Sequence, residues 1–135
     1  RQRSLPIWHR DSFLRRQGVA GVSVVSSTSA DAAAAVPSLG KVVLWADTFN
    51  NHFEPAVLTA ARQVLRAAGY EVILGRATAQ DGPQRPLCCG RTFLAAGLVE
   101  QAKAEAQRTL RALEPLVAQG IPVVGARTVV PAHPA

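Results

Sequence analysis

Short apolar runs alternate with longer amphipathic stretches over residues 41–125, and this alternation constrains the possible folds more than any other feature of the chain. The apolar runs occupy 41–46, 70–74 and 121–125. Runs that are short and apolar throughout are typical of strands buried on both faces of a parallel sheet. The stretches between them give the order strand, helix, strand, loop, helix, strand. This order predicts an α/β fold: a small parallel three-stranded sheet with right-handed crossovers and two main helices.

Each expected helix has recognisable ends. Pro55 suits the first position of the first helix, and Gly69 stops it. A loop rich in Gly and Pro covers residues 75–90. The second helix should end at Gly120, and Pro115 should kink it or restart its last turn.

The second helix is amphipathic. Its apolar stripe consists of Leu98, Ala102, Ala106, Leu110, Leu113 and Val117. Three pairs of opposite charge at i,i+3 spacing are expected on its outer face, namely Glu100/Lys103, Glu105/Arg108 and Arg111/Glu114. Each pair should stabilise the helix by a few tenths of a kcal/mol.

Composition excludes several classes of protein. Apolar residues make up 48% of the chain and charged residues 18%, which excludes a wholly disordered protein. No apolar run is long enough for a membrane span, so we expect a cytoplasmic protein, with peripheral association at the inner membrane face as an alternative. The net charge of +6 divides evenly between residues 1–40 and 41–135. Because the excess charge is spread and no reading motif accompanies it, no nucleic-acid partner is predicted.

The chain divides into four segments by composition. Residues 1–17 are Arg-rich, 18–40 form a low-complexity linker, 41–125 form the ordered domain, and 126–135 form a tail that we expect to be disordered. Within the first segment, the run Arg10 to Gln17 could form two helical turns. Residues 1–40 are not expected to pack into the core, and their large side chains, Trp8 and Phe13, should dock on a neighbouring module instead. Since the chain contains no Met and begins with Arg, we expect it to be a processed product or an internal fragment.

The most informative motif is the adjacent pair Cys88-Cys89, flanked by Arg85 and Arg91 and followed by Gly90. Adjacent Cα atoms lie about 3.8 Å apart, whereas disulfides usually join Cα atoms roughly 4.4–6.8 Å apart. A structural disulfide is therefore not expected. Flanking Arg residues favour thiolates, which could bind a metal or an iron–sulfur cluster. The alternative is two buried structural cysteines, because a cluster normally needs four ligands.

The first strand is followed by polar residues that could also carry chemistry. Ligands of parallel sheets bind beyond the carboxyl ends of the strands, which here are 47–54, 75–91 and whatever follows Gly125. Asp47 and His52 could act as acid and base, although a strand-end Asp and a loop His are more often structural. No dinucleotide-binding or Walker motif accompanies them.

Four segments in order resemble the cysteine-rich CCG domain that occurs in heterodisulfide reductase and in the iron–sulfur component of glycolate oxidase, in the version fused to FAD-linked oxidases. The segments are Val42 to Pro55, Ala68 to Val72, Cys88 to Arg91, and Gly120 to Gly125. The resemblance covers residues 41–125 and, more faintly, Leu5 to Arg16, and it implies that the domain is incomplete.

The chain departs from the family pattern at two places. The upstream family Cys falls on Thr48, which puts a full cluster in doubt, although the fused-oxidase branch resembles this chain there. After Gly125 the family continues with a Cys-bearing segment similar to Leu-Glu-Pro-Ser-Cys-Leu-Leu-Thr-Leu, whereas this chain does not. Synonymous codons exist for which residues 126–135, read one base later, encode that segment. We therefore hypothesise that the tail is a frameshifted reading, which sequencing of the gene would test.

The resemblance implies an electron-transfer domain of an FAD-linked oxidoreductase that oxidises a 2-hydroxy acid such as glycolate or D-lactate. Cys88 and Cys89 would be ligands of a 4Fe–4S cluster in the parent protein. The FAD would lie on a flavin domain outside this chain, beside a ferredoxin-like module, and a quinone or cytochrome would accept the electrons. The fragment alone should be inactive and should not hold a cluster.

Two alternatives remain open from the sequence. The chain could be a cluster-free α/β module for binding or interaction, or a small thiol-dependent enzyme that uses Cys88 as its nucleophile.

Overall fold

The computed structural model describes residues 6–17, 38–77 and 85–126, and its centre is a parallel sheet. The strands are β1 (Gly40–Trp45), β2 (Tyr70–Gly75) and β3 (Val123–Gly125), in the order β2-β1-β3. β1 pairs with β2 from Gly40↔Tyr70 to Trp45↔Gly75 and with β3 over three residues. This confirms the predicted α/β class and the predicted place of the last strand beside the first.

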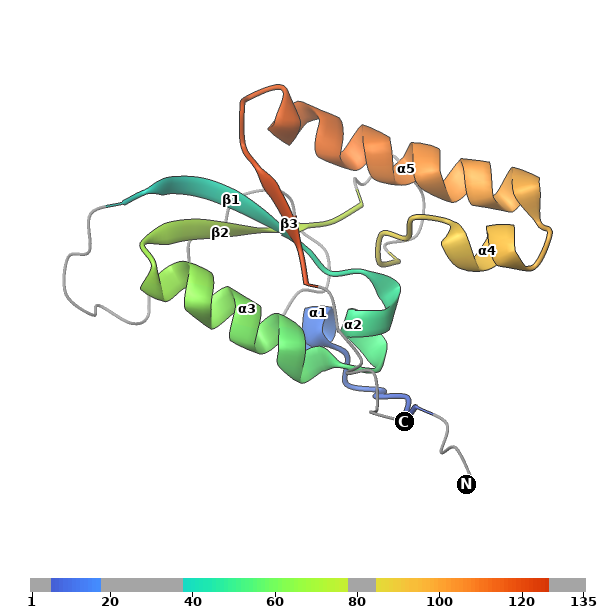
Figure 1. Ribbon diagram of the computed structural model, residues 1–135, viewed down its shortest axis with the longest axis horizontal. Coiled ribbons are helices and arrows are strands. Elements are labelled where there is room, and N and C mark those ends of the chain that lie inside the picture. Colours follow the sequence, from blue (N-terminus) through green and yellow to red (C-terminus); the bar gives the residue numbers. More distant parts are fainter. Residues whose placement is uncertain (1–5, 18–37, 78–84, 127–135) are drawn as a thin grey trace, which may run out of the picture.

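The two main helices, α3 (Pro55–Ala67) and α5 (Val99–Val117), lie on opposite faces of the sheet (Figure 1). The chain steps from β1 to one neighbour and then crosses β1 to reach the other. Because both crossovers are right-handed, the reversal of direction puts the two helices on different faces. Pro55 begins α3 as predicted, and Gly69, at φ 92°, follows its end.

Of the three short helices, α1 (Phe13–Arg16) lies within the run predicted to form two helical turns, whereas α2 (Thr48–His52) and α4 (Arg91–Ala95) were not expected from the sequence. Asp47 caps α2, because its Oδ1 accepts hydrogen bonds from the backbone N–H groups of Phe49 (2.9 Å) and Asn50 (3.1 Å). α4 is separated from α5 by Gly97, whose φ is 78°. The loop predicted over 75–90 is therefore followed by a short helix and then by the long one.

The core contradicts the expectation that residues 1–40 stay outside it. Phe13 is completely buried and belongs to one cluster with Leu44, Ala46 and Leu58. The cluster lies between α1, the sheet and α3, so α1 forms part of the domain rather than a docking peptide for another module. Trp8 is about half exposed, and its ring stacks on His52 of α2.

Two hydrogen bonds hold the N-terminal segment in this position. The His9 N–H donates to the His52 carbonyl (2.8 Å), and the Leu14 N–H donates to Oδ1 of Asn51 (2.9 Å). Most of the expected linker (18–40) and of the expected disordered tail (126–135) lies outside the described residues. Where the two segments are described, Gly40 already belongs to β1 and Ala126 packs against the core, so neither residue fits the expectation.

The buried face of α5 differs from the predicted apolar stripe. Leu110 and Val117 of that stripe are 66% and 55% exposed. The buried residues of the helix are Ala102, Glu105, Arg108, Thr109 and Ala112. The helix is turned in this way because its first half covers a polypeptide segment with polar carbonyl groups rather than the apolar sheet.

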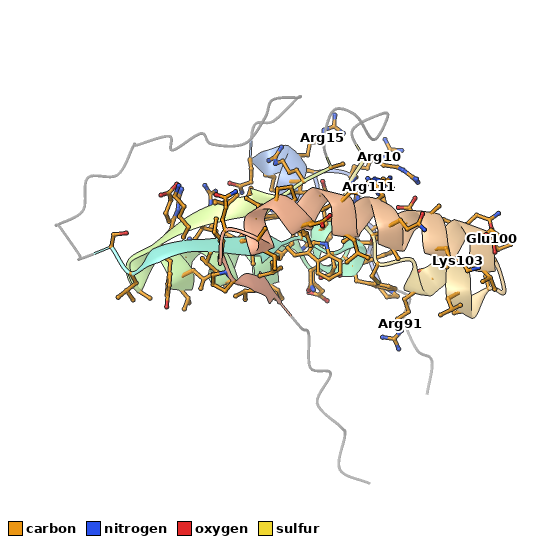
Figure 2. All side chains as sticks on the ribbon, turned by 90° about the horizontal axis from the view of Figure 1, so that it is seen from above. Arg10, Arg15, Arg91, Glu100, Lys103 and Arg111 are labelled. Carbon is orange, nitrogen blue, oxygen red and sulfur yellow. The ribbon has the colours of Figure 1, made fainter. Side chains whose placement is uncertain are left out.

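Two of the charged pairs expected on α5 differ in their exposure to solvent. Glu100 and Lys103 form the expected exposed pair at 3.0 Å (Figure 2). The Glu105–Arg108 pair, at 2.8 Å, is buried, so its expected place on the outer face was wrong. The helix runs through Pro115 as far as Val117.

None of the helices in the described ranges is at once long and apolar enough to cross a lipid bilayer.

Candidate functional site

The cysteine pair lies on a segment, residues 85–90, that runs along α5 into α4. It is found on the side of the sheet toward which the carboxyl ends of the strands point (Figure 1). The sequence had predicted this side as the place for a ligand, since ligands of parallel sheets bind beyond the carboxyl ends of the strands.

Side chains of α5 hold the backbone of this segment by its carbonyl groups. Nη1 of Arg108 donates to the Arg85 carbonyl (3.1 Å), and Nη2 donates to the Pro86 carbonyl (2.7 Å). Oγ1 of Thr109 donates to the Cys88 carbonyl (2.8 Å). Leu87 is completely buried between these contacts.

Gly90 allows the segment to approach α5 closely. Its φ is +80°, and a Cβ at this position would lie 2.4 Å from the Ala102 carbonyl oxygen. A side chain would therefore push the segment off the helix. The glycine after the cysteine pair was recognised in the sequence as a position of close approach, but its neighbour is α5.

The two thiols are free and differ in accessibility. Cys88 is half-buried and Cys89 is exposed, which agrees with the expectation that the adjacent cysteines form no structural disulfide. The interpretation of both as buried cysteines is wrong for Cys89. A reagent or partner in solvent meets Cys89 first.

The arginines around the pair have different surroundings. The guanidinium of Arg85 is paired with the carboxylate of Glu105, so part of its charge is offset within the chain. Arg91 is exposed at the start of α4, and its side chain projects away from the ribbon (Figure 2). Of the two arginines, Arg91 is therefore the one whose charge is directed to solvent.

Asp47 and His52, the other candidate residues, have structural roles in α2. Asp47 is the cap of the helix. The His52 ring stacks on Trp8 with centroids 4.2 Å apart, and burial lowers the pKa of this histidine. Thr48, at the position of the upstream family Cys, is the first residue of α2.

The donor set for a metal is small in the part of the chain that the structure describes. There, no three His, Cys, Asp or Glu side chains come together as a metal-binding group. A 4Fe–4S cluster is usually held by four thiolates, so residues 6–17, 38–77 and 85–126 alone do not fit the whole cluster.

Sequence reasoning missed the polar residues that organise this side of the molecule. Glu105, Arg108 and Thr109 fix the cysteine segment, and the side chain of Asn50 donates to the carbonyl of Ala126 just beyond β3. The available signal was the spacing of Glu105, Arg108 and Thr109 at i, i+3 and i+4 along the long helix, of which the pair Glu105/Arg108 was predicted to lie on the exposed face.

Comparisons of the chain with models of protein families, with curated proteins and with solved structures find no match. A function must therefore be argued from the residues of the site.

Proposed function

We propose that this chain is an electron-transfer domain of an FAD-linked oxidoreductase that oxidises a 2-hydroxy acid such as glycolate or D-lactate. Cys88 and Cys89 would serve as two ligands of a 4Fe–4S cluster in the parent protein. The observation that carries the proposal is the state of the pair: two free thiols, one of them exposed, on a segment tethered to α5. The order of the four family-like segments along the chain supports it.

The remaining parts of the electron path would lie outside the described residues. Because these residues offer two thiolates, further ligands would come from other parts of the parent protein. The flavin and ferredoxin-like modules would supply electrons, and a quinone or cytochrome would accept them. On this proposal the parent protein would lie in the cytoplasm or at the inner face of the membrane.

The alternatives from the sequence gain less support. An enzyme that used Cys88 as its nucleophile would rely on the half-buried thiol of the pair, while the accessible thiol is that of Cys89. A cluster-free binding module would leave the exposed Cys89 without a role.

The proposal is tested in the full-length parent protein, which the flanking gene sequence would identify. After anaerobic purification we expect the visible absorbance of an iron–sulfur cluster, and this absorbance should fall when Cys88 and Cys89 are both replaced by Ser. The isolated chain should lose iron and sulfide on desalting after reconstitution. A stoichiometric cluster that survived on the isolated monomer would contradict the proposed division of ligands.

A further inference from the structure

The buried face of α5 is polar at the place where it meets the cysteine segment. Glu105 is 4% exposed, Arg108 5% and Thr109 7%. Burying an ion pair costs desolvation energy that its mutual attraction often does no more than offset. Stability alone is therefore a weak explanation for charged residues at this place.

The contacts of Arg108 show what the buried charges hold. Its Nη2 lies 2.8 Å and its Nε 3.3 Å from Oε2 of Glu105, which fixes the plane of the guanidinium. The same group then donates to two carbonyls of the cysteine segment, those of Arg85 and Pro86. Glu105 also binds the side chain of Arg85 through its other oxygen. The Glu105–Arg108 pair therefore binds the first residues of the segment, Arg85 and Pro86, by hydrogen bonds.

The segment and the helix run in opposite directions, so further contacts between them follow along successive turns of α5. Arg108 holds residues 85 and 86, Thr109 holds the Cys88 carbonyl, and the backbone at Ala102 touches Gly90. The chain is thus fixed on both sides of Cys89, and this residue is left exposed between two anchored neighbours.

We propose that Glu105, Arg108 and Thr109 are positioning residues for the cysteine pair. They keep Cys89 presented to a partner or cluster and keep Cys88 partly covered. The purpose of this arrangement rests on the proposed function, but the positioning itself can be measured from thiol chemistry without iron.

The first test compares a variant that lacks the buried ion pair with a variant that lacks an exposed ion pair on the same helix. Glu105→Leu/Arg108→Met is the test variant, and Glu100→Leu/Lys103→Met is the control, because both delete an i,i+3 pair of the same charges. The rate of alkylation by iodoacetamide is measured at each cysteine by peptide mass spectrometry, together with the melting temperature.

We expect Cys89 to react faster than Cys88 in the chain without substitutions. In Glu105→Leu/Arg108→Met the rate at Cys88 should rise about tenfold, because the hydrogen bonds that close the segment on α5 are lost. The melting temperature should change little, since apolar replacement of a buried ion pair is often neutral. The control should keep parental rates at both cysteines.

If Glu105→Leu/Arg108→Met fails to fold, the ion pair is needed for stability. A second comparison then tests the positioning role. Thr109→Val removes the hydrogen bond to the Cys88 carbonyl at nearly constant volume, and Thr109→Ser retains the hydroxyl. Cys88 should react faster in Thr109→Val and at the parental rate in Thr109→Ser. Unchanged rates in Thr109→Val would overturn the positioning role. Changed rates in a parent protein without iron would retain the positioning role and refute the proposed function.

Discussion

At the scale of single residues, Asn51 links the N-terminal segment to α2 through both ends of its side-chain amide. Oδ1 accepts from the Leu14 N–H, and Nδ2 lies 3.1 Å from Nε2 of His52. Since the amide nitrogen donates, Nε2 must accept, and the neutral ring then carries its proton on Nδ1. Nδ1 is buried with no hydrogen-bond partner among the described residues. A second proton on His52 would replace the acceptor that Asn51 needs with a donor.

The stability of the protein should therefore depend on pH through His52. Burial lowers its pKa in the folded state, so the unfolded chain takes up a proton first as the pH falls. The free energy of unfolding should be intact above the ordinary His pKa of about 6.5 and should decrease below it. Urea titrations at pH about 7.5 and about 5.5 measure this decrease, which His52→Gln should reduce and His9→Gln should leave in place. An equal decrease in His52→Gln and the parent would show that other groups cause it.

The place of Phe13 in the core could not be predicted from the sequence. It lies in an Arg-rich segment with few apolar neighbours, and the helix that contains it has four residues, too few for a periodic pattern. Phe13→Ala should lower the free energy of unfolding by about 3–5 kcal/mol, because it empties a fully buried site. Phe49→Ala, at a side chain that is 61% exposed, is the control and should cost far less. Equal costs in chemical denaturation would mean that Phe13 is not a core residue.

At the scale of elements, the three strands and the two long helices could be predicted because each has a pattern of its own. The short helices α2 and α4 could not, because they have five residues each and depend on a cap or on contacts with other elements. The face of α5 was predicted wrongly for a different reason. Leu110 extends an apolar stripe by spacing, yet the partner of that part of the helix is a segment whose carbonyls need polar donors.

Two leucines of α5 test its orientation directly. Cδ2 of Leu113 packs over Gly75 of β2, within 3.4 Å of where a Cβ would lie, whereas Leu110 is mostly exposed. Leu113→Ala should lower the free energy of unfolding by about 2 kcal/mol or more, and Leu110→Ala should change it by no more than about 0.5 kcal/mol. Because the predicted apolar stripe contains both leucines, equally large costs at the two positions, measured in urea, would mean that the helix is turned as the stripe suggested.

At the scale of the whole molecule, the topology brings together residues that are far apart in the sequence. The strand order β2-β1-β3 sets α3 and α5 on opposite faces and leaves the cysteine segment at the carboxyl side of the sheet. The class, the parallel pairing and the side of the sheet on which the cysteine segment lies could all be predicted, because they follow from the order of elements and from handedness. The contact between α5 and the cysteine segment could not be predicted, since it depends on side-chain hydrogen bonds between residues about twenty positions apart.

The proposed function requires Cys88 and Cys89 to be iron–sulfur ligands in the parent protein, and the iron and acid-labile sulfide content of that protein tests this assignment most directly. Three proteins are compared after identical anaerobic reconstitution: the parent, Cys88→Ser/Cys89→Ser, and a control, Leu94→Ser, which changes an exposed residue of neighbouring α4 and keeps both thiols. We expect iron and sulfide per chain to fall in the double variant and to stay at the parental level in the control. Parental iron and sulfide in Cys88→Ser/Cys89→Ser would contradict the assignment.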